Sequence, residues 1–71
     1  MKDIQSLPLT STETDILLKL CDGMLYKEIA VERQSAFETV KKHISNIYRK
    51  LHVNNRMDAC NVYREHQKKY A

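Results

Sequence analysis

One stretch, TVKKHISNIYRKL at residues 39–51, limits the possible folds of this chain more than any other. Its apolar residues recur at the spacing i, i+4, i+7 and i+11, which places them on one stripe of an α-helix. These residues are Val40, Ile44, Ile47 and Leu51. The opposite side holds only basic or small polar residues, namely Lys41, Lys42, Ser45, Asn46, Arg49 and Lys50. Such a helix can pack one face on a core and present the other to solvent or to a phosphate-lined groove.

The rest of the composition favours a small helical domain. The chain has 71 residues, and a domain of this size buries roughly 60% of its unfolded surface. It contains one Gly and one Pro, too few for a fold that needs many β-turns. No apolar run approaches the ~20 residues that span a bilayer. Cys21 and Cys60 are far apart and follow no signal peptide, so we expect reduced thiols in a cytoplasmic protein.

Charge is distributed unevenly along the chain. Residues 1–35 hold four basic and six acidic side chains, whereas residues 36–71 hold eight basic and three acidic ones. The second half therefore carries a net charge of +5, and the first half a net charge of −2. This asymmetry predicts a polyanionic partner for the half that contains the basic helix.

Capping signals divide the chain into four predicted helices. Thr10 and Glu13 fit a capping box at the start of the first helix, which runs to about Cys21. Gly23 follows, where a left-handed residue is expected. The later helices are predicted at about 26–33, 37–51 and 56–66, with Asn54 or Asn55 as the cap of the last. The domain then covers residues 9–66, with a lead-in or linker remnant at 1–8 and a frayed basic tail at 67–71.

Two helices joined by a short turn, the second of them basic, form the helix-turn-helix arrangement. The chain resembles the LuxR-type (GerE-like) helix-turn-helix domain over about residues 9–63, nearly its whole length. The matching residues, in order and spacing, are Leu9, Thr10, Glu13, Ile16, Leu17, Gly23, Lys27, Glu28, Ile29, Ala30, Thr39, Val40, Lys41, His43, Ile47, Tyr48, Lys50, Leu51, Val53, Arg56 and Ala59.

This resemblance implies sequence-specific binding of double-stranded DNA in transcriptional regulation, as in the output domains of response regulators. The helix at about 37–51 would lie in the major groove, and the positions of Lys41, Lys42 and Ser45 would reach base edges. Lysine can donate to guanine O6 and N7, and serine can serve either kind of partner. The residues expected at phosphates are Lys27, Thr39, Asn46, Arg49 and Lys50.

The sequence departs from the family pattern around the turn between the second and third helices. Arg33 and Ser35 stand where aliphatic residues are usual, and Ala36 stands where the family has a capping Ser. Leu25 occupies the usual cap position of the second helix. We expect Val31 and Phe37 to supply the missing apolar contacts. His52 replaces a common Gly after the third helix and is expected to adopt a left-handed conformation.

Other classes of function have weaker support. No Ser, Cys or carboxylate has the sequence context of a nucleophile or an acid–base pair, so we predict a non-enzyme without a cofactor. The cysteines and histidines show no paired metal-ligand spacing. We expect Glu28 and Arg56 to support the structure, and His43 to be a core histidine.

The resemblance also implies partners other than DNA. The last helix commonly pairs two domains of this family, and Met57 and Cys60 are predicted to be exposed there, as contacts of a homodimer. Two alternatives stay open: a degenerate helix-turn-helix that serves as a protein-interaction module, for example as an RNA polymerase contact, and the related promoter-reading domain of sigma factors.

Overall fold

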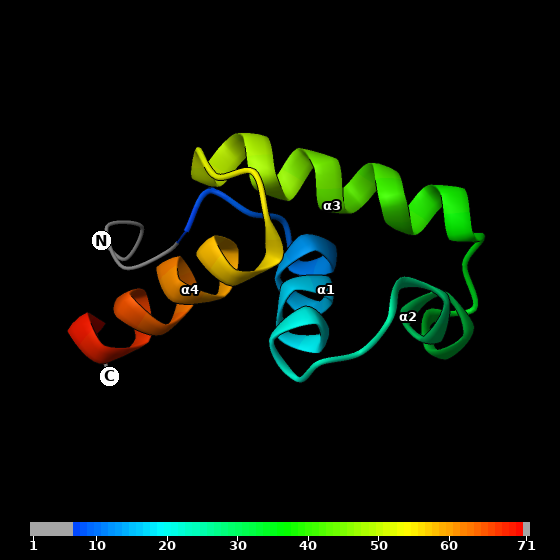
Figure 1. Cartoon of the computed structure of the whole chain (residues 1–71), viewed down its shortest axis with the longest axis horizontal. Coiled ribbons are helices and arrows are strands. Elements are labelled where there is room, and N and C mark those ends of the chain that lie inside the picture. The colour runs from blue at the N-terminus through cyan, green and yellow to red at the C-terminus, as the bar shows by residue number, and fades with distance from the viewer. Residues whose placement is uncertain (1–6, 71) are drawn as a thin grey trace.

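The computed structural model describes residues 7–70, which form four α-helices and no β-strand. The helices are α1 (Ser11–Cys21), α2 (Tyr26–Arg33), α3 (Phe37–Leu51) and α4 (Arg56–Tyr70). Figure 1 shows α1 in the centre, with α2 and α4 on either side of it and α3 running along one side of the molecule. The predicted all-α helix-turn-helix architecture is confirmed.

The helix bounds agree with the predictions except at the end of the last helix. α4 continues to Tyr70, so residues 67–70 are helical and not the frayed tail that the sequence suggested. Of the predicted lead-in, residues 1–6 lie outside the described residues, as does Ala71 at the other end. Leu7 is partly buried against the core. No helix among residues 7–70 is long and apolar enough to cross a membrane.

The core lies where α1 meets the inner stripe of α3. The four apolar residues that define the stripe of α3 are all buried, as their spacing predicts. Apolar residues of the other helices complete the core: Ile16, Leu17 and Leu20 from α1, Ile29 and Ala30 from α2, and Ala59 from α4. Leu9, just before the first cap, packs against this cluster and fixes how the chain enters α1.

The first and last helices begin with side-chain caps. The Thr10 hydroxyl accepts from the Glu13 amide at 3.1 Å, and the Glu13 carboxylate accepts from the Thr10 amide at 3.0 Å. This is the predicted capping box. Asn55 caps α4, because its side-chain oxygen accepts from the Asp58 amide at 2.9 Å. Ala36, the N-cap of α3, has no side-chain acceptor and leaves the first amides of this helix uncapped.

The first three helices all end with a left-handed residue and a backbone bond that reaches back over the last turn. The left-handed residues are Gly23, Gln34 and His52, with φ of 87°, 56° and 59°. After each of them, the next amide donates to a carbonyl five residues earlier, at 2.9–3.1 Å. This is the Schellman pattern, which satisfies carbonyls that the helix itself leaves free. The left-handed conformation predicted for Gly23 and His52 is confirmed.

Ion pairs hold α2 against α1 and account for the polar turn. Arg33 donates to the carboxylate of Asp15 on α1, and Lys19 bridges Asp15 at 3.0 Å and Glu32 at 3.3 Å. Arg33 therefore replaces the usual aliphatic contact with a charged one. The Lys19 ammonium lowers the pKa of Asp15 below its ordinary value, and Arg33 acts in the same direction. Burial of the carboxylate acts in the opposite direction but is outweighed.

The prediction that Val31 supplies a missing apolar contact is wrong. Val31 is 78% exposed, because the last turn of α2 directs it away from α1 and α3. Phe37 is 44% exposed and does make contacts: its ring lies 6.4 Å from that of Tyr26, between centroids. Tyr26 also neighbours Tyr48 of α3, and burial together with this neighbour raises the pKa of Tyr48 above its usual range. Tyr26 thus links α2 to both ends of α3.

Glu28 and Arg56 support the structure, as predicted. The Glu28 carboxylate accepts from the backbone amide of Leu25 at 2.7 Å, which caps the start of α2 from within the helix. The Arg56 guanidinium donates to the carbonyl of Met24 at 2.8 Å. This bond ties the first residue of α4 to the loop between α1 and α2.

Candidate nucleic-acid interface

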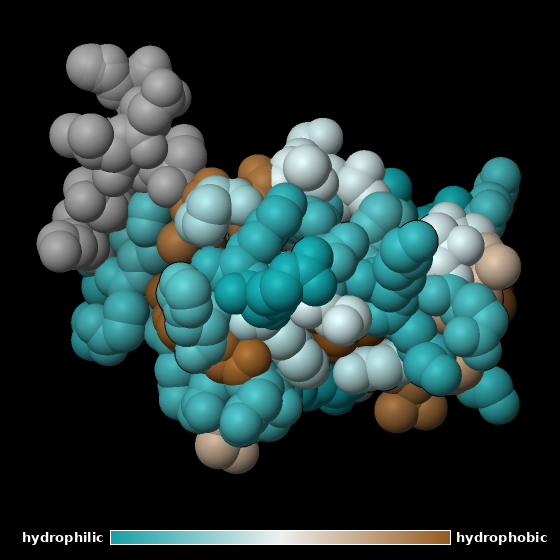
Figure 2. Space-filling view, turned by 90° about the horizontal axis from the view of Figure 1, so that it is seen from above, coloured by the Kyte–Doolittle hydropathy of each residue, from teal (hydrophilic) through white to brown (hydrophobic). Residues whose placement is uncertain are grey.

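The outward face of α3 is polar and largely cationic. Figure 2, which looks onto the molecule from the side of α3, shows a mostly hydrophilic surface. The exposed residues of this helix include Glu38, Thr39, Lys41, Lys42, Ser45 and Arg49. Because the opposite stripe is fixed in the core, α3 cannot turn this face inward without losing its apolar contacts. The residues that the sequence predicts at base edges therefore share one surface.

The three predicted base contacts differ in how freely they can move. Lys41 lies 3.8 Å from the Glu38 carboxylate and 5.6 Å from the centre of the Phe37 ring. Both contacts are at the edge of useful range and leave the ammonium available. Lys42 and Ser45 are exposed and have no side-chain partner among residues 7–70. These two side chains can therefore reorient toward a ligand without breaking an existing bond.

The predicted phosphate contacts fall into two groups. Lys27 on α2 and Thr39 in the first turn of α3 are exposed and unpaired within the described residues. Arg49 donates to the side-chain oxygen of Asn46 at 2.8 Å, which holds the guanidinium along the outer side of α3. A guanidinium has further donors, so this bond does not prevent it from binding a phosphate.

Lys50 has a different partner from the phosphate that the sequence suggested. Its ammonium lies 2.8 Å from the carboxylate of Glu13, a residue that is 4% exposed. Burial opposes ionisation of Glu13, but the Lys50 ammonium and the Thr10 amide outweigh it, so the pKa of this carboxyl lies below its ordinary value. A lysine that neutralises a buried carboxylate would have to leave it uncompensated in order to bind a phosphate.

Glu38, for which no role was predicted, also lies on this surface. Its side chain is 81% exposed in the first turn of α3, four residues before Lys42. A carboxylate here disfavours nearby phosphates, yet it can accept a hydrogen bond from the amino group of cytosine. The signal was in the sequence, since Glu38 and Lys42 are spaced i, i+4 and share a face.

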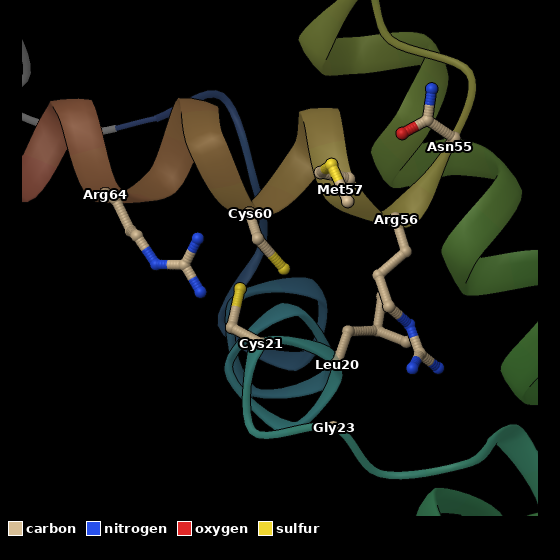
Figure 3. A pocket seen from close by; sticks show the side chains of 8 residues that line it. All are labelled: Leu20, Cys21, Gly23, Asn55, Arg56, Met57, Cys60 and Arg64. Carbon is tan, nitrogen blue, oxygen red and sulfur yellow. The ribbon is translucent and has the colours of Figure 1, made fainter.

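Only one of the two predicted dimer contacts is exposed. Met57 in the first turn of α4 is 72% exposed, as predicted. The prediction that Cys60 is also exposed is wrong, because this residue is 4% exposed and faces α1 (Figure 3). The i, i+3 spacing placed both residues on one side of the helix. The packing of α4 on α1 covers Cys60 and leaves Met57 outside.

Among residues 7–70, no group of three or more His, Cys, Asp or Glu side chains is placed to hold a metal ion. His43 is half-buried on α3. The functional groups on the α3 surface that can bind a ligand are therefore ammonium, guanidinium, hydroxyl, amide and one carboxylate. These groups can make hydrogen bonds and ion pairs to phosphates and base edges.

Comparisons with known proteins agree with this geometry. The family described as bacterial regulatory proteins, luxR family, matches residues 7–63. The chain is 43% identical over 54 residues to the probable HTH-type transcriptional regulator GfsR of Streptomyces halstedii. It is 40% identical over 55 residues to the nitrate/nitrite response regulator protein NarP of Escherichia coli. It is also 38% identical over 56 residues to the HTH-type transcriptional regulator MalT of Vibrio campbellii. No solved structure matches the chain.

These matches cover most of this chain but little of the relatives. They span 76% of the chain for GfsR, 78% for NarP and 79% for MalT. The same segments represent 22%, 26% and 6% of those three proteins. The similarity therefore concerns one domain of much longer regulators.

Proposed function

This chain belongs to the luxR family of bacterial regulatory proteins, whose helix-turn-helix domains bind DNA in transcription regulation, and we propose that α3 is its recognition helix. In this arrangement α3 lies in the major groove with Lys41, Lys42 and Ser45 at base edges. Lys27, Thr39, Asn46 and Arg49 hold the flanking phosphates. The family consists of non-enzymatic regulators, in agreement with the prediction that the chain is not an enzyme.

One observation carries this proposal. The cationic residues of α3 are exposed and the apolar stripe of the same helix is buried, so the only surface that α3 can offer a groove is the basic one. We assign Lys50 to the structure, because its ammonium already neutralises the buried Glu13. Lys27 lies on the neighbouring helix and is exposed, so it can approach the phosphate backbone beside α3.

The test compares a base contact with a phosphate contact. A preferred site is first selected from a random duplex library, and binding is then measured on that site and on random DNA. Lys42→Ala should cost about 1–3 kcal/mol on the preferred site and less on random DNA. Arg49→Ala should weaken both to a similar degree and reduce the slope of log affinity against log salt by about one unit.

Lys68→Ala is the matched control, since it removes the same charge from an exposed position on α4. It should change either affinity by much less than Lys42→Ala. If Lys42→Ala and Lys68→Ala behave alike on both DNAs, α3 does not read the groove through the face assigned here.

We also propose that two copies pair through α4 when bound to DNA, with Met57 at the contact. The support is that Met57 is a large apolar side chain left 72% exposed in the first turn of this helix. Met57→Lys should reduce cooperative binding to a duplex with two half-sites and leave the affinity for a single half-site unchanged. An equal loss on both duplexes would contradict pairing through this residue.

A second candidate function has its own observation, the exposed apolar side chains of the α2 region. Leu25 is 56% and Val31 78% exposed, on a part of the molecule that is not the outward face of α3. A contact with a protein such as RNA polymerase would account for them. In that case Val31→Ser would leave DNA affinity unchanged and lower transcription in a purified system. Unchanged transcription would exclude Val31 from such a contact.

The wider setting is also a proposal. The similarity to NarP supports a role as the output domain of a response regulator. Because the proposed ligand is chromosomal DNA, we also propose that the protein acts in the bacterial cytoplasm. Transcription from a selected promoter in cells, with this chain expressed alone or fused to a receiver domain, tests both statements, because a domain excluded from the cytoplasm would have no effect.

A further inference from the structure

The two cysteines meet at the contact between α1 and α4. Cys21 is the last residue of α1, and Cys60 lies in the second turn of α4. Figure 3 shows the two sulfur atoms pointing toward one another across the space between these helices. Both thiols are free. Residues that are distant in sequence have thus been brought face to face by the packing of the first helix on the last.

The two thiols differ in their access to solvent. Cys60 is buried at 4% exposure, whereas Cys21 is half-buried. Both line an open pocket whose other walls are Leu20, Gly23, Asn55, Arg56, Met57 and Arg64. Cys21 is therefore the more accessible of the two thiols to a small solute that enters the pocket.

The surroundings favour the protonated form of Cys21. Burial, together with the neighbouring Cys60 thiol, raises the pKa of Cys21 to about 12. The thiolate is the reactive form, so reaction at neutral pH is slow and speeds up as the pH rises. The attack of Cys21 on an external disulfide is then the slow step, and the intramolecular attack by Cys60 that follows is fast. Little of the mixed disulfide between Cys21 and the external thiol therefore accumulates.

We propose that Cys21 and Cys60 are a site of oxidative modification, at which a low-molecular-weight disulfide converts the two thiols into an intramolecular disulfide. The Cys21 thiolate attacks one sulfur of the small disulfide, and one thiol leaves. Cys60 then loses its proton and attacks the Cys21 sulfur of the mixed disulfide, which releases the second thiol. The protein loses two protons and two electrons, equivalent to two hydrogen atoms, and the small disulfide gains them and becomes two thiols.

The cross-link has a defined structural consequence. It joins the end of α1 to α4 and closes a long loop that contains α2 and α3, so it restricts the unfolded chain much more than the folded one. The residues assigned to DNA lie on the outer face of α3 and on α2, away from the two sulfurs. The disulfide should therefore stabilise the domain without blocking the surface that binds DNA.

The experiment uses oxidised glutathione on the folded chain at mildly alkaline pH. We expect intact mass to show the loss of two hydrogen atoms, no retained glutathione and no covalent dimer. The melting temperature should rise by roughly 10 °C or more and return to its starting value on reduction. Retained glutathione, covalent dimers or two thiols that stay free after prolonged exposure would each overturn the proposal.

Single-cysteine variants supply the control. Cys21→Ala and Cys60→Ala each leave one thiol, so neither should show the mass loss or the rise in melting temperature on oxidation. If Cys60→Ala proves too unstable to fold, Cys21→Ala, which changes a half-buried position, gives the same comparison. A rise of equal size in a single-cysteine variant would show that oxidation stabilises the protein by another route.

Discussion

Single residues with left-handed backbone end three of the four helices, and only one of them is glycine. Gly23 adopts this conformation without cost, and a Cβ at this position would meet no atom within 4 Å. Gln34 and His52 carry side chains at φ of 56° and 59°. A non-glycine residue in this region costs roughly 1–2 kcal/mol. The chain therefore stores a small amount of backbone strain at both ends of the segment that contains α3.

His52→Gly should relieve that strain at the end of α3. The glycine also increases the entropy of the unfolded chain, so the net gain is expected at about 0.5–1 kcal/mol. For a domain of this size, ~1 kcal/mol shifts the melting temperature by about 4–8 °C. Gly23→Ala is the matched control and should lower the melting temperature. Because a Cβ at Gly23 would meet no atom within 4 Å, any loss of stability comes from the left-handed backbone alone. A melting temperature that falls in His52→Gly would mean that the imidazole makes a contact worth more than the strain.

Ala36→Ser should stabilise the start of the recognition helix. Ala36 is the N-cap, with extended backbone (φ −73°, ψ 149°) and no side-chain bond to the first turn. A serine hydroxyl in this position can accept from an amide of that turn, which is worth about 0.5–2 kcal/mol over alanine. Thermal melting should then rise by several degrees. No change would mean that the uncapped amides are already satisfied by solvent.

Residue by residue, the sequence predicted which side chains α3 buries, because a strong apolar period leaves little choice of face. It did not predict the burial of Cys60 or the exposure of Val31, because both sit on short or weakly periodic stretches. There the face is decided by which neighbour the helix packs against. The ion pair between Lys50 and Glu13 could not be predicted either, because the two residues lie 37 positions apart in sequence and only the fold brings them together.

At the scale of whole elements, the pair between Glu13 and Lys50 joins the first turn of α1 to the last turn of α3. The carboxylate is 5% exposed and serves at once as part of the capping box and as the partner of the ammonium. It therefore couples the start of the domain to the end of the recognition helix. Its pKa lies below the ordinary value of 4.5, so the unfolded state binds the proton more readily.

This coupling predicts a dependence of stability on pH. A lowered carboxyl pKa contributes stability that is complete above about 4.5 and is lost as the pH falls through the folded-state value. Glu13→Gln keeps the capping geometry and removes the charge, at an expected cost of about 1–3 kcal/mol near neutral pH. The gap in melting temperature between the two proteins should therefore narrow in acid. Asp15 is present in both proteins, so its own contribution to the pH dependence cancels in the difference between them. If the difference in melting temperature does not change with pH, the negative charge of Glu13 does not account for the stability that the Glu13–Lys50 pair contributes.

The bounds of the elements could be predicted because caps mark them. Thr10 with Glu13, Gly23 and Asn55 are local signals that fix a helix end without knowledge of the tertiary structure. The end of α4 lacks such a signal, and the prediction stopped at His66 although the helix continues to Tyr70. The turn between α2 and α3 was also unclear, because its polar residues depart from the family pattern. The ion pair of Arg33 with Asp15 explains that departure.

At the scale of the whole molecule, charge and shape act together. The +5 net charge of residues 36–71 is not spread over the surface as a uniform field, because Lys50 is held by Glu13 and Arg56 by the Met24 carbonyl. What remains on the outward face of α3 is Lys41, Lys42 and Arg49, joined by Lys27 from α2. A sequence count overestimates the number of cations available to a ligand, and the structure identifies the ones already in use.

Titration of this chain with random duplex DNA at several salt concentrations shows whether α3 binds DNA through its cationic face. If each domain neutralises roughly three to five phosphates, log affinity should fall with log salt at a slope of about −3 to −4.5. Folded protein that shows no binding at low salt, or binding that does not change with salt, would contradict the account of α3 as a helix that binds DNA.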